Sequence, residues 1–345
     1  MRVKKININN IPRKIMVVKP SSLGDVVHSL PFLSALHECF PFAKIDWVIA
    51  RGIEGMLEGN PLINKLWIID KDKWKNVGRI PGTISELGRL ARAVKAEKYD
   101  IVIDLQGLMR SGLITKATCA PVRIGFAEAR EGSVLCYTHR VEGGRELHAV
   151  DRYLKVVSAL GYDESNIRFP LPLVRESEKI AELKSKIGDY AVIVAGARWN
   201  TKKWPAENFA QVAASLDMAS VVVGSESDRG IAMAIEKQSD NKAISMAGET
   251  DMSDLMWLIR GAKLMISNDS GPMHIAAAGG IPVVAIFGPT NPGRTGPYGP
   301  NNMVLKTNAE CAPCYKRSCK DNRCMRDITP DRVLEAVRAI VARKP

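Results

Sequence analysis

The chain has 345 residues, a length that exceeds what one hydrophobic core usually organises, so two domains are expected. Its composition, 46% hydrophobic and 25% charged with no run of eighteen apolar residues, is that of a folded protein and excludes a membrane-spanning helix from the prediction. The 49 lysines and arginines outnumber the 37 aspartates and glutamates, giving a net charge of +12, which indicates an anionic partner (nucleic acid, phosphorylated ligand or acidic membrane surface) unless it is only a basic solvated surface.

Residues 1–14 include five basic side chains but no following apolar stretch of signal-peptide length, so secretion is not expected. The seven cysteines are odd in number and fit a reducing compartment better than a disulfide framework. These features predict a cytoplasmic protein.

From residue 14 onward, short β-branched runs alternate with helical patterns such as the amphipathic segment 84–97. This alternation is typical of βαβ units in a parallel sheet. A helix over 148–160 closes the first half, and the proline-bearing segment 169–173 is expected to be a connector. The predicted strands of this half are 15–18, 45–49, 66–69, 101–105 and 122–126.

A second βα series follows, and it completes an α/β fold of two Rossmann-like lobes, residues 1–172 and 173–345. The C-terminal helix is expected to pack back on the first lobe. Ligands of such sheets lie at the carboxyl ends of the strands, so functional residues are sought in the loops that follow them. The predicted elements are strands 191–194, 220–223, 264–267 and 283–287 and helices near 205–216, 227–238 and 253–260.

The loop after the first strand places Asp25 in the first turn of the next helix. One interpretation is that Asp25 caps the helix and interacts with its dipole, worth about 0.3–1 kcal/mol. The other is that it serves as a general base and takes a proton from an attacking hydroxyl. His28, one turn further, either assists or packs.

In the second half, the loop after strand 191–194 carries Lys202 and Lys203 ahead of a helix opened by Pro205. A lysine at this position is either an idle surface charge or the cation that neutralises a departing diphosphate. Glu226, after the next strand, is either a ribose-binding acid or a solvated loop residue.

The most informative segment is Ser267 to His274, where a buried strand delivers Asp269, Ser270 and Gly271 to the start of a helix. Unpaired N–H groups and the helix dipole at such a start favour a bound anion, such as a nucleotide phosphate. His274 lies four residues after Ser270 and faces the same side, so it is either aimed at phosphate or a satisfied core histidine.

Three other features limit the choice of ligand. The turn-rich loop 288–293 either contacts the ligand or only reverses the chain. Neither a GxGxxG fingerprint nor a Walker A loop occurs, which argues against NAD enzymes and P-loop kinases. Aromatic residues are not interleaved with the basic ones, so a nucleic-acid partner is not expected.

Four cysteines lie close together in a basic, loop-like segment near the C-terminus, at a spacing that differs from a paired zinc finger. They either hold a structural zinc ion or remain free or redox-labile thiols. No obligatory cofactor and no catalytic metal is expected. The four are Cys311, Cys314, Cys319 and Cys324.

Five motifs in a fixed order span about residues 14–340. They are Lys19-Pro-Ser-Ser-Leu-Gly-Asp-Val-Val-His-Ser-Leu-Pro, Asp104-Leu-Gln-Gly-Leu, Ala129-Arg130-Glu131, Lys202-x-Trp204-Pro205, and Asn268-Asp-Ser-Gly-Pro-Met-His with Phe287-Gly-Pro-Thr-Asn-Pro. Together they resemble glycosyltransferase family 9, the ADP-heptose:lipopolysaccharide heptosyltransferases. The first and third motifs are closer to heptosyltransferase I than to heptosyltransferase II.

The resemblance implies a GT-B architecture with the active site in a cleft between the lobes and transfer with inversion. It implies ADP-L-glycero-D-manno-heptose as the donor substrate and a Kdo residue of lipid A as the acceptor, in synthesis of the lipopolysaccharide inner core. The enzyme would work at the cytoplasmic face of the inner membrane, held peripherally by its anionic surface. The alternatives are a family 9 transferase with another core acceptor, or a non-catalytic nucleotide-sugar or nucleic-acid binder.

The resemblance also implies roles for individual residues. Asp25 matches the catalytic base, Lys202 the diphosphate-binding lysine, Glu226 a ribose contact and Met252 an adenine-side position. The donor-binding loop corresponds to Asp269, Ser270, Gly271 and His274, and residues of the acceptor lobe to Asp104, Gln106 and Arg130.

Overall fold

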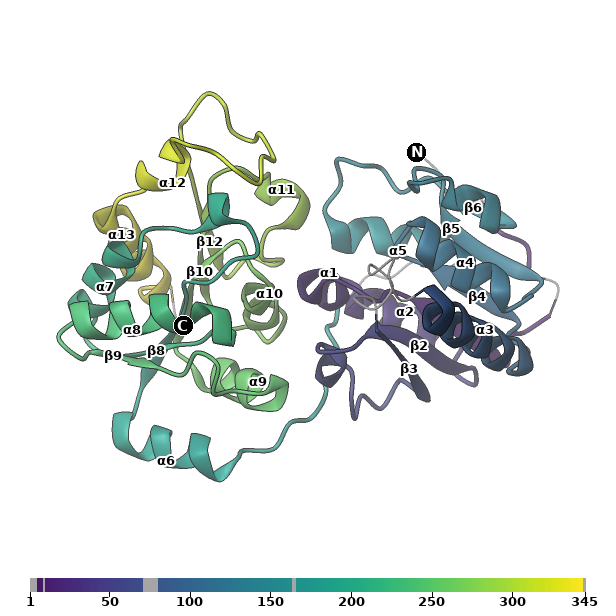
Figure 1. Cartoon of the computed structure of the whole chain (residues 1–345), viewed down its shortest axis with the longest axis horizontal. Helices are drawn as coiled ribbons and strands as arrows, with labels where there is room; N and C mark the ends of the chain where they lie inside the picture. The colour runs from purple at the N-terminus through teal and green to yellow at the C-terminus, as the bar shows by residue number, and fades with distance from the viewer. Residues whose placement is uncertain (1–4, 9, 71–79, 163–165, 344–345) are drawn as a thin grey trace. The chain divides into compact units, whose positions relative to one another are not determined.

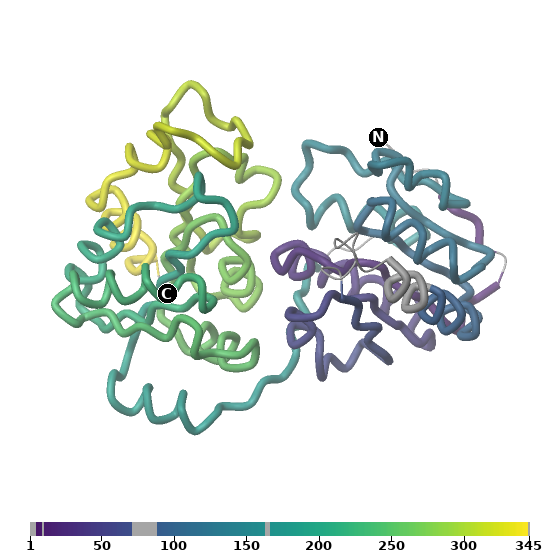
Figure 2. The backbone as a smooth tube through the Cα atoms, in the orientation of Figure 1, coloured from purple at the N-terminus to yellow at the C-terminus, as the bar shows by residue number. Residues whose placement is uncertain are grey.

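The computed structural model describes residues 5–8, 10–70, 80–162 and 166–343, excepting the side chains of 80–87, and the chain divides into two compact units, Met1–Leu173 and Val174–Pro345. Each unit contains one six-stranded sheet among its described residues, with helices around it (Figure 1). Figure 2 follows the backbone from the first unit, purple to teal, into the second, teal to yellow. The predicted α/β class with two Rossmann-like lobes is confirmed.

The first sheet has the strand order β3-β2-β1-β4-β5-β6, and every neighbouring pair is parallel. Helices α2 and α5 pack together on one face, and α3 and α4 on the other (Figure 1). Because both faces are covered, the central strands are almost wholly apolar. The strands are β1 Lys14–Val18, β2 Lys44–Ala50, β3 Lys65–Ile69, β4 Ile101–Asp104, β5 Val122–Phe126 and β6 His139–Val141. The helices are α1 Leu23–His28, α2 Leu30–Cys39, α3 Ile80–Ala96, α4 Met109–Ala117 and α5 Ala149–Ala159, with 3-10 segments η1 Glu54–Met56 and η4 Ser133–Cys136.

The second sheet has the order β12-β11-β10-β7-β8-β9 and is also parallel throughout. Helices α7, α8 and α13 form one layer, and α9 and α10 form the other (Figure 1). The strands are β7 Tyr190–Val194, β8 Ala219–Val222, β9 Ala243–Ser245, β10 Leu264–Asn268, β11 Val283–Phe287 and β12 Asn302–Lys306. The helices are α6 Glu178–Ile187, α7 Ala206–Ser215, α8 Arg229–Gln238, α9 Met252–Gly261, α10 Gly271–Ala278, α11 Pro292–Thr295, α12 Arg323–Arg326 and α13 Pro330–Val341, with 3-10 segments η5 Asn200–Lys202 and η6 Glu226–Asp228.

The nine strands predicted from the sequence are all present, within two residues at each end. The sequence analysis missed β6, β9 and β12, which are edge strands of the two sheets. Two of them are only three residues long, and β12 is half-buried along its length. Short or half-buried strands lack the continuous apolar run on which the prediction depended.

The C-terminal helix α13 packs within its own unit, against α7 and β12. Val333, Val337 and Ile340 are buried in the same core as Phe209 of α7. Its apolar stripe is thus covered within the second unit, and packing of this helix against the first lobe stays a prediction.

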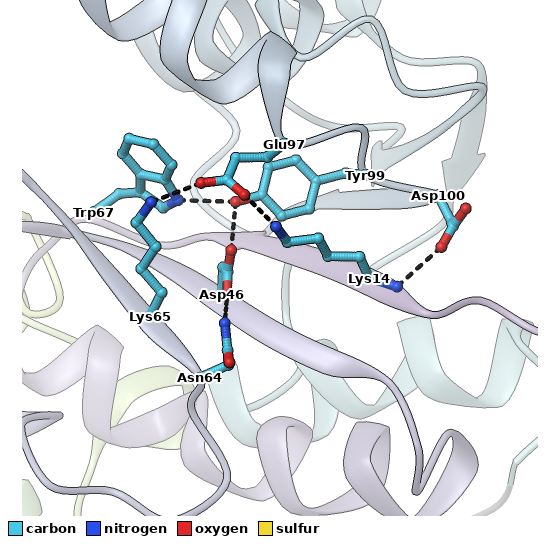
Figure 3. A network of polar contacts seen from close by, with 8 residues as sticks. All are labelled: Lys14, Asp46, Asn64, Lys65, Trp67, Glu97, Tyr99 and Asp100. Carbon is cyan, nitrogen blue, oxygen red and sulfur yellow. Dashed lines mark hydrogen bonds and ion pairs between the residues drawn. The ribbon is translucent and has the colours of Figure 1, made fainter.

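At the amino edge of the first sheet, side chains from three segments enclose the buried carboxylate of Asp46 (Figure 3). Its two oxygens accept hydrogen bonds from Asn64 Nδ2, at 2.7 Å, and from the Tyr99 hydroxyl, at 2.6 Å. The Tyr99 oxygen in turn accepts a bond from Trp67 Nε1 at 2.8 Å. Burial and the bond to Asp46 raise the pKa of Tyr99 well above its usual value. This network joins β2, β3 and the segment before β4.

Replacing Tyr99 by Phe should lower the free energy of unfolding by about 1–3 kcal/mol. The substitution keeps the ring but removes a donor from buried Asp46 and an acceptor from Trp67. Urea denaturation at neutral pH measures the change. The control is Tyr315→Phe, a partly exposed tyrosine, for which about 0.5 kcal/mol or less is expected. Equal midpoints for the two variants would contradict the role given to the network.

Candidate functional site

In a parallel sheet the carboxyl ends of all strands meet at one edge, where loops from distant parts of the sequence come together. In the first unit, the loops after β1 and β4 are joined by a hydrogen bond from Ser21 N to Gln106 Oε1, at 3.3 Å. The two loops carry Asp25 and Asp104, so the residues expected to act on an acceptor lie at the same edge.

Asp25 is the third residue of α1 and partly exposed, with 37% of its side chain accessible. One carboxylate oxygen accepts hydrogen bonds from the backbone N–H of Ser22, at 3.0 Å, and from its hydroxyl, at 2.8 Å. These bonds stabilise the start of the helix. The other oxygen lies 4.0 Å from Lys19 Nζ. Capping therefore occupies one oxygen, and both interpretations of Asp25 are compatible with its geometry.

Lys19 lies beneath Asp25, with only 4% of its side chain exposed. Its ammonium is 5.3 Å from the centre of the Tyr153 ring, on α5. Burial opposes the charged form of Lys19, but the charge of Asp25, followed by Tyr153 and Asp104, outweighs it and raises the pKa of Lys19 above its usual 10.5. A fixed cation next to Asp25 favours the ionised carboxylate, the form that accepts a proton.

Asp104 is fully buried at the end of β4. One oxygen accepts bonds from the N–H groups of Gln106, at 2.8 Å, and Gly107, at 3.0 Å, and the other accepts one from the Tyr137 hydroxyl at 2.7 Å. Burial raises the pKa of Asp104, although these bonds favour its charged form. Asp104 thus shapes the β4–α4 loop. Arg130, by contrast, is exposed, and its N–H donates to the Gly107 carbonyl at 2.9 Å.

In the second unit, Asn268 lies at the end of β10 and hydrogen-bonds to the loop that follows β7. Its Oδ1 accepts from the N–H of Trp204 at 3.1 Å, and its Nδ2 donates to the Ala195 carbonyl at 2.7 Å. The loop after β7 is thereby fixed against the start of α10. This brings the Lys202 segment beside Asp269.

Lys202 and Asp269 form a tight ion pair, with Nζ 2.6 Å from a carboxylate oxygen. The same oxygen accepts a bond from the Thr290 hydroxyl at 2.6 Å, and Lys202 Nζ lies 4.5 Å from the centre of the Trp199 ring. The aspartate is 8% exposed and the lysine 17%. The pair therefore presents its cation rather than its anion toward solvent.

Helix α10 begins directly after this pair. Ser270 is its N-cap residue, with Oγ 3.2 Å from Ser267 Oγ, and Gly271 is its first residue. His274 is buried in the first turns of the helix. The strand end, the N-cap and the helix start therefore follow one another as expected, next to the Lys202–Asp269 ion pair, and the binding of an anion there stays a prediction.

Glu226 and Met252 lie at the starts of two other elements, η6 and α9. The Glu226 side chain is 73% exposed and pairs with Arg229 at 3.1 Å. It extends over Gly248, where an added Cβ would be 2.2 Å from its Oε2. Among the described residues, no hydrogen bond or ion pair that the structure shows joins Glu226 or Met252 to Lys202.

Two side chains that sequence reasoning missed, Trp199 and Arg317, lie at the same edge. The Arg317 guanidinium is 5.2 Å from the centre of the Trp199 ring. The Lys202 ammonium contacts the same ring. The segment bearing Arg317 is held by the Thr201 hydroxyl donating to the Lys316 carbonyl at 2.7 Å and by Tyr315 N donating to Pro289 O at 2.9 Å. Trp199 and Arg317, like Thr201 and Lys316, are more than a hundred residues apart in the chain, so no local pattern could reveal these two contacts.

The four clustered cysteines do not form the zinc site that the sequence allowed. Within the described part of the chain, which includes 311–324, no group of three or more histidine, cysteine or acidic side chains is arranged to hold a metal ion. Cys324 is buried, and burial followed by the neighbouring thiols raises its pKa. Hydrogen bonds from backbone N–H groups instead lower the pKa of exposed Cys319. Among those same residues, no helix is long and apolar enough to cross a bilayer.

Comparison with known proteins gives consistent matches. A family model described as "Glycosyltransferase family 9 (heptosyltransferase)" matches residues 87–324. The chain is 30% identical to lipopolysaccharide heptosyltransferase 1 of Pseudomonas aeruginosa, over 89% of this chain and 87% of that protein. A glycosyl transferase family 9 structure from Veillonella parvula is 28% identical with a TM-score of 0.82, over 96% of this chain and 98% of that one. An E. coli heptosyltransferase solved with ADP-2-deoxy-2-fluoro heptose shares the fold, with a TM-score of 0.76 at 23% identity over 94% and 99% of the two chains.

Because the pKa of Lys19 is raised, the free energy of unfolding should depend on pH in the alkaline range. Its ammonium stabilises the fold fully below its unfolded value of 10.5, and this contribution is lost as the pH rises through the folded pKa. Lys19→Met should therefore be less stable at pH 7 by about 1–3 kcal/mol and lose less stability than the wild type as the pH rises above 10.5. Urea midpoints across this range measure both effects.

The control is Lys186→Met, an exposed lysine of α6 that pairs only with Glu182 among the interactions seen in the described residues. It should behave like the wild type at every pH. A Lys19→Met variant with the wild-type alkaline profile would contradict the electrostatic account of Lys19.

Proposed function

The chain belongs to glycosyltransferase family 9, and from this premise we propose that it transfers L-glycero-D-manno-heptose from ADP-heptose to a Kdo residue of lipid A. The resemblance drawn from the motifs is confirmed, and the protein is a glycosyltransferase. Support for the donor comes from the family's description and from the relative bound to an ADP-heptose analogue. Support for the acceptor comes from the first and third motifs and from the similarity to heptosyltransferase 1.

The observation that carries the proposal is the exposed Asp25 carboxylate held over buried Lys19. A sugar hydroxyl is a weak nucleophile, so a base must remove its proton as it attacks. We assign this to Asp25: the acceptor oxygen forms a bond to the anomeric carbon, its proton passes to Asp25, and the bond to ADP breaks with its electrons leaving on the diphosphate. One such displacement inverts the anomeric configuration.

In the proposed donor site, the departing diphosphate is stabilised by Lys202 and the start of α10. An ammonium group has three N–H donors, and Asp269 occupies one of them, so the others remain for phosphate oxygens. Asp269 thus acts as a positioning residue for Lys202 rather than as a ligand, because a carboxylate repels phosphate. Ser270, Gly271 and His274 complete the loop that receives the diphosphate.

The remaining contacts of the donor are assigned by motif. Glu226 accepts hydrogen bonds from the ribose, and Met252 lies on the adenine side. Both residues begin elements at the carboxyl edge of the second sheet, which is where a nucleotide binds in a Rossmann-like lobe.

The proposed acceptor is a membrane lipid, which places the reaction at the cytoplasmic face of the inner membrane with the enzyme attached peripherally. The net charge of +12 suits such an anionic surface. Gln106 and Arg130, at the edge that carries Asp25, are the side chains proposed to meet the acceptor's charged groups.

Replacing Asp25 by Asn should reduce turnover by about 10²- to 10⁴-fold, because the base is lost while the side chain keeps its size. Purified protein is incubated with ADP-heptose and Kdo-lipid A, and released ADP and the mass of the product are measured. Binding of ADP by calorimetry should stay within a few-fold of the wild type. Asp151→Asn, an acid in the first turn of α5, is the control and should retain activity.

Retained turnover in Asp25→Asn would overturn the assignment of the base. If the wild type releases ADP only with other core acceptors, the assignment of Kdo-lipid A as the acceptor is wrong. The protein would then be a heptosyltransferase that acts at another step of core synthesis.

Lys202→Met should weaken ADP-heptose binding by about 10- to 100-fold, the equivalent of a lost charged hydrogen bond. The matched control is the adjacent Lys203→Met, which should bind the donor normally. Isothermal titration with ADP-heptose gives both affinities. If the two variants have the same affinity as the wild type, Lys202 does not bind the diphosphate.

A further inference from the structure

Helix α4 and segment η4 pack against each other in the first unit and leave two leucines in solvent. Leu113 is 56% exposed and Leu135 is 77% exposed. Side chains of η4 pack closely against α4 at Gly112, where an added Cβ would lie 3.0 Å from Ser133 Cβ and 3.1 Å from Cys136 Sγ. We call this exposed face of the two elements the α4–η4 surface.

The outward residues of α4 recur every three positions, which places them on one side of the helix. These outward residues are Arg110, Leu113 and Lys116, and the residues between them are buried. An exposed leucine therefore lies between two exposed cations on this side of the helix. Arg130, just before η4, is also exposed.

The cations of this surface have no acidic partner among the residues that the structure describes, as far as ion pairs are seen. The nearest acid in the sequence, Glu131, accepts a hydrogen bond from the N–H of Met109 at 3.1 Å. Arg110, Lys116 and Arg130 against Glu131 leave the surface with an excess of positive charge. The α4–η4 surface is thus both apolar and basic.

The surface is continuous with the edge that carries Asp25. Helix α4 follows β4, and η4 follows β5, so both start from the carboxyl edge of the sheet. The backbone N–H of Arg130 donates to the Gly107 carbonyl, and the backbone N–H of Ser21 donates to Gln106 Oε1, so the surface is connected to the Asp25 loop. A partner bound to this surface would therefore lie close to the acceptor side of the site.

We propose that the α4–η4 surface docks on an anionic lipid bilayer, with Leu113 and Leu135 entering the headgroup region and Arg110 and Lys116 meeting lipid phosphates. The inference rests on the proposed function, whose acceptor is a membrane lipid. Basic side chains around apolar ones are typical of proteins that attach to a membrane surface. The burial of apolar side chains and the attraction to anionic lipids both add to the binding free energy. Two leucines are few for a protein interface, which usually takes 20–30 residues a side, about 800 Å².

The test measures cosedimentation with vesicles of phosphatidylcholine alone and with about one third phosphatidylglycerol. The wild type should bind the anionic vesicles, and binding should fall with salt because exposed charges are screened. Leu113→Ser/Leu135→Ser should lower partitioning about tenfold or more, and Arg110→Gln/Lys116→Gln by a similar factor. Phe42→Ser is the control. Phe42 is 92% exposed and lies in the same unit, in the connection before β2. This variant should bind the anionic vesicles as the wild type does.

A second readout separates docking from chemistry. The leucine variant should lose activity on acceptor embedded in vesicles but keep kcat/KM for an acceptor sugar that lacks acyl chains. Equal losses on both acceptors would overturn the proposal, as would wild-type binding of anionic vesicles by the leucine variant. Loss of self-association, rather than of vesicle binding, in that variant would identify the surface as an interface between copies and also overturn it.

The proposed function can fail independently. If no acceptor is glycosylated while vesicle binding depends on the two leucines, the acceptor assignment is wrong and the docking surface stands.

Discussion

A lysine paired with an aspartate at the carboxyl edge of a parallel sheet occurs in both units, and the proposed chemistry depends on how the two pairs differ. In the first unit the lysine is buried and the aspartate exposed, with 4.0 Å between their charged atoms. In the second unit the distance is 2.6 Å and the aspartate is the more buried partner. The first pair thus presents its anion toward solvent, and the second presents its cation. A base and a phosphate-binding group are what an inverting glycosyl transfer needs.

The surroundings of each pair explain why it is held. A buried charge is costly unless it is paired and hydrogen-bonded. Tyr153 and Asp104 lie near Lys19 in addition to Asp25. Asp269 accepts a hydrogen bond from the Thr290 hydroxyl and also pairs with Lys202. The partner that faces solvent can then interact with a ligand without leaving its buried counterpart unpaired. Local helix starts reinforce this arrangement, since the N-terminus of α10 favours an added anion.

Much of this organisation could be predicted from the sequence, because it depends on position along a βα unit. Long buried strands such as β10 were found from their apolar runs, and Asp25 and Lys202 from the loops that follow strands. Lys19 was visible in its motif, but its burial under Asp25 depends on the packing of α5. Arg317 reaches Trp199 across more than a hundred residues, which no periodicity or spacing reports. The thiol cluster shows the reverse: close spacing in sequence did not produce a metal-binding geometry.

The packing that buries Asp104 also determines which side chains face outward at the acceptor edge. Tyr137 donates to Asp104 and lies over Gly125, where an added Cβ would be 2.3 Å from its ring. Cys136, the residue before it, is packed against Gly112 of α4. With Cys136 and Tyr137 both directed inward, the short η4 segment leaves Leu135 in solvent. The exposed leucine is therefore a consequence of fixing the β4–α4 loop, and a lipid surface that covered it would stabilise the same segment that shapes the acceptor side of the site.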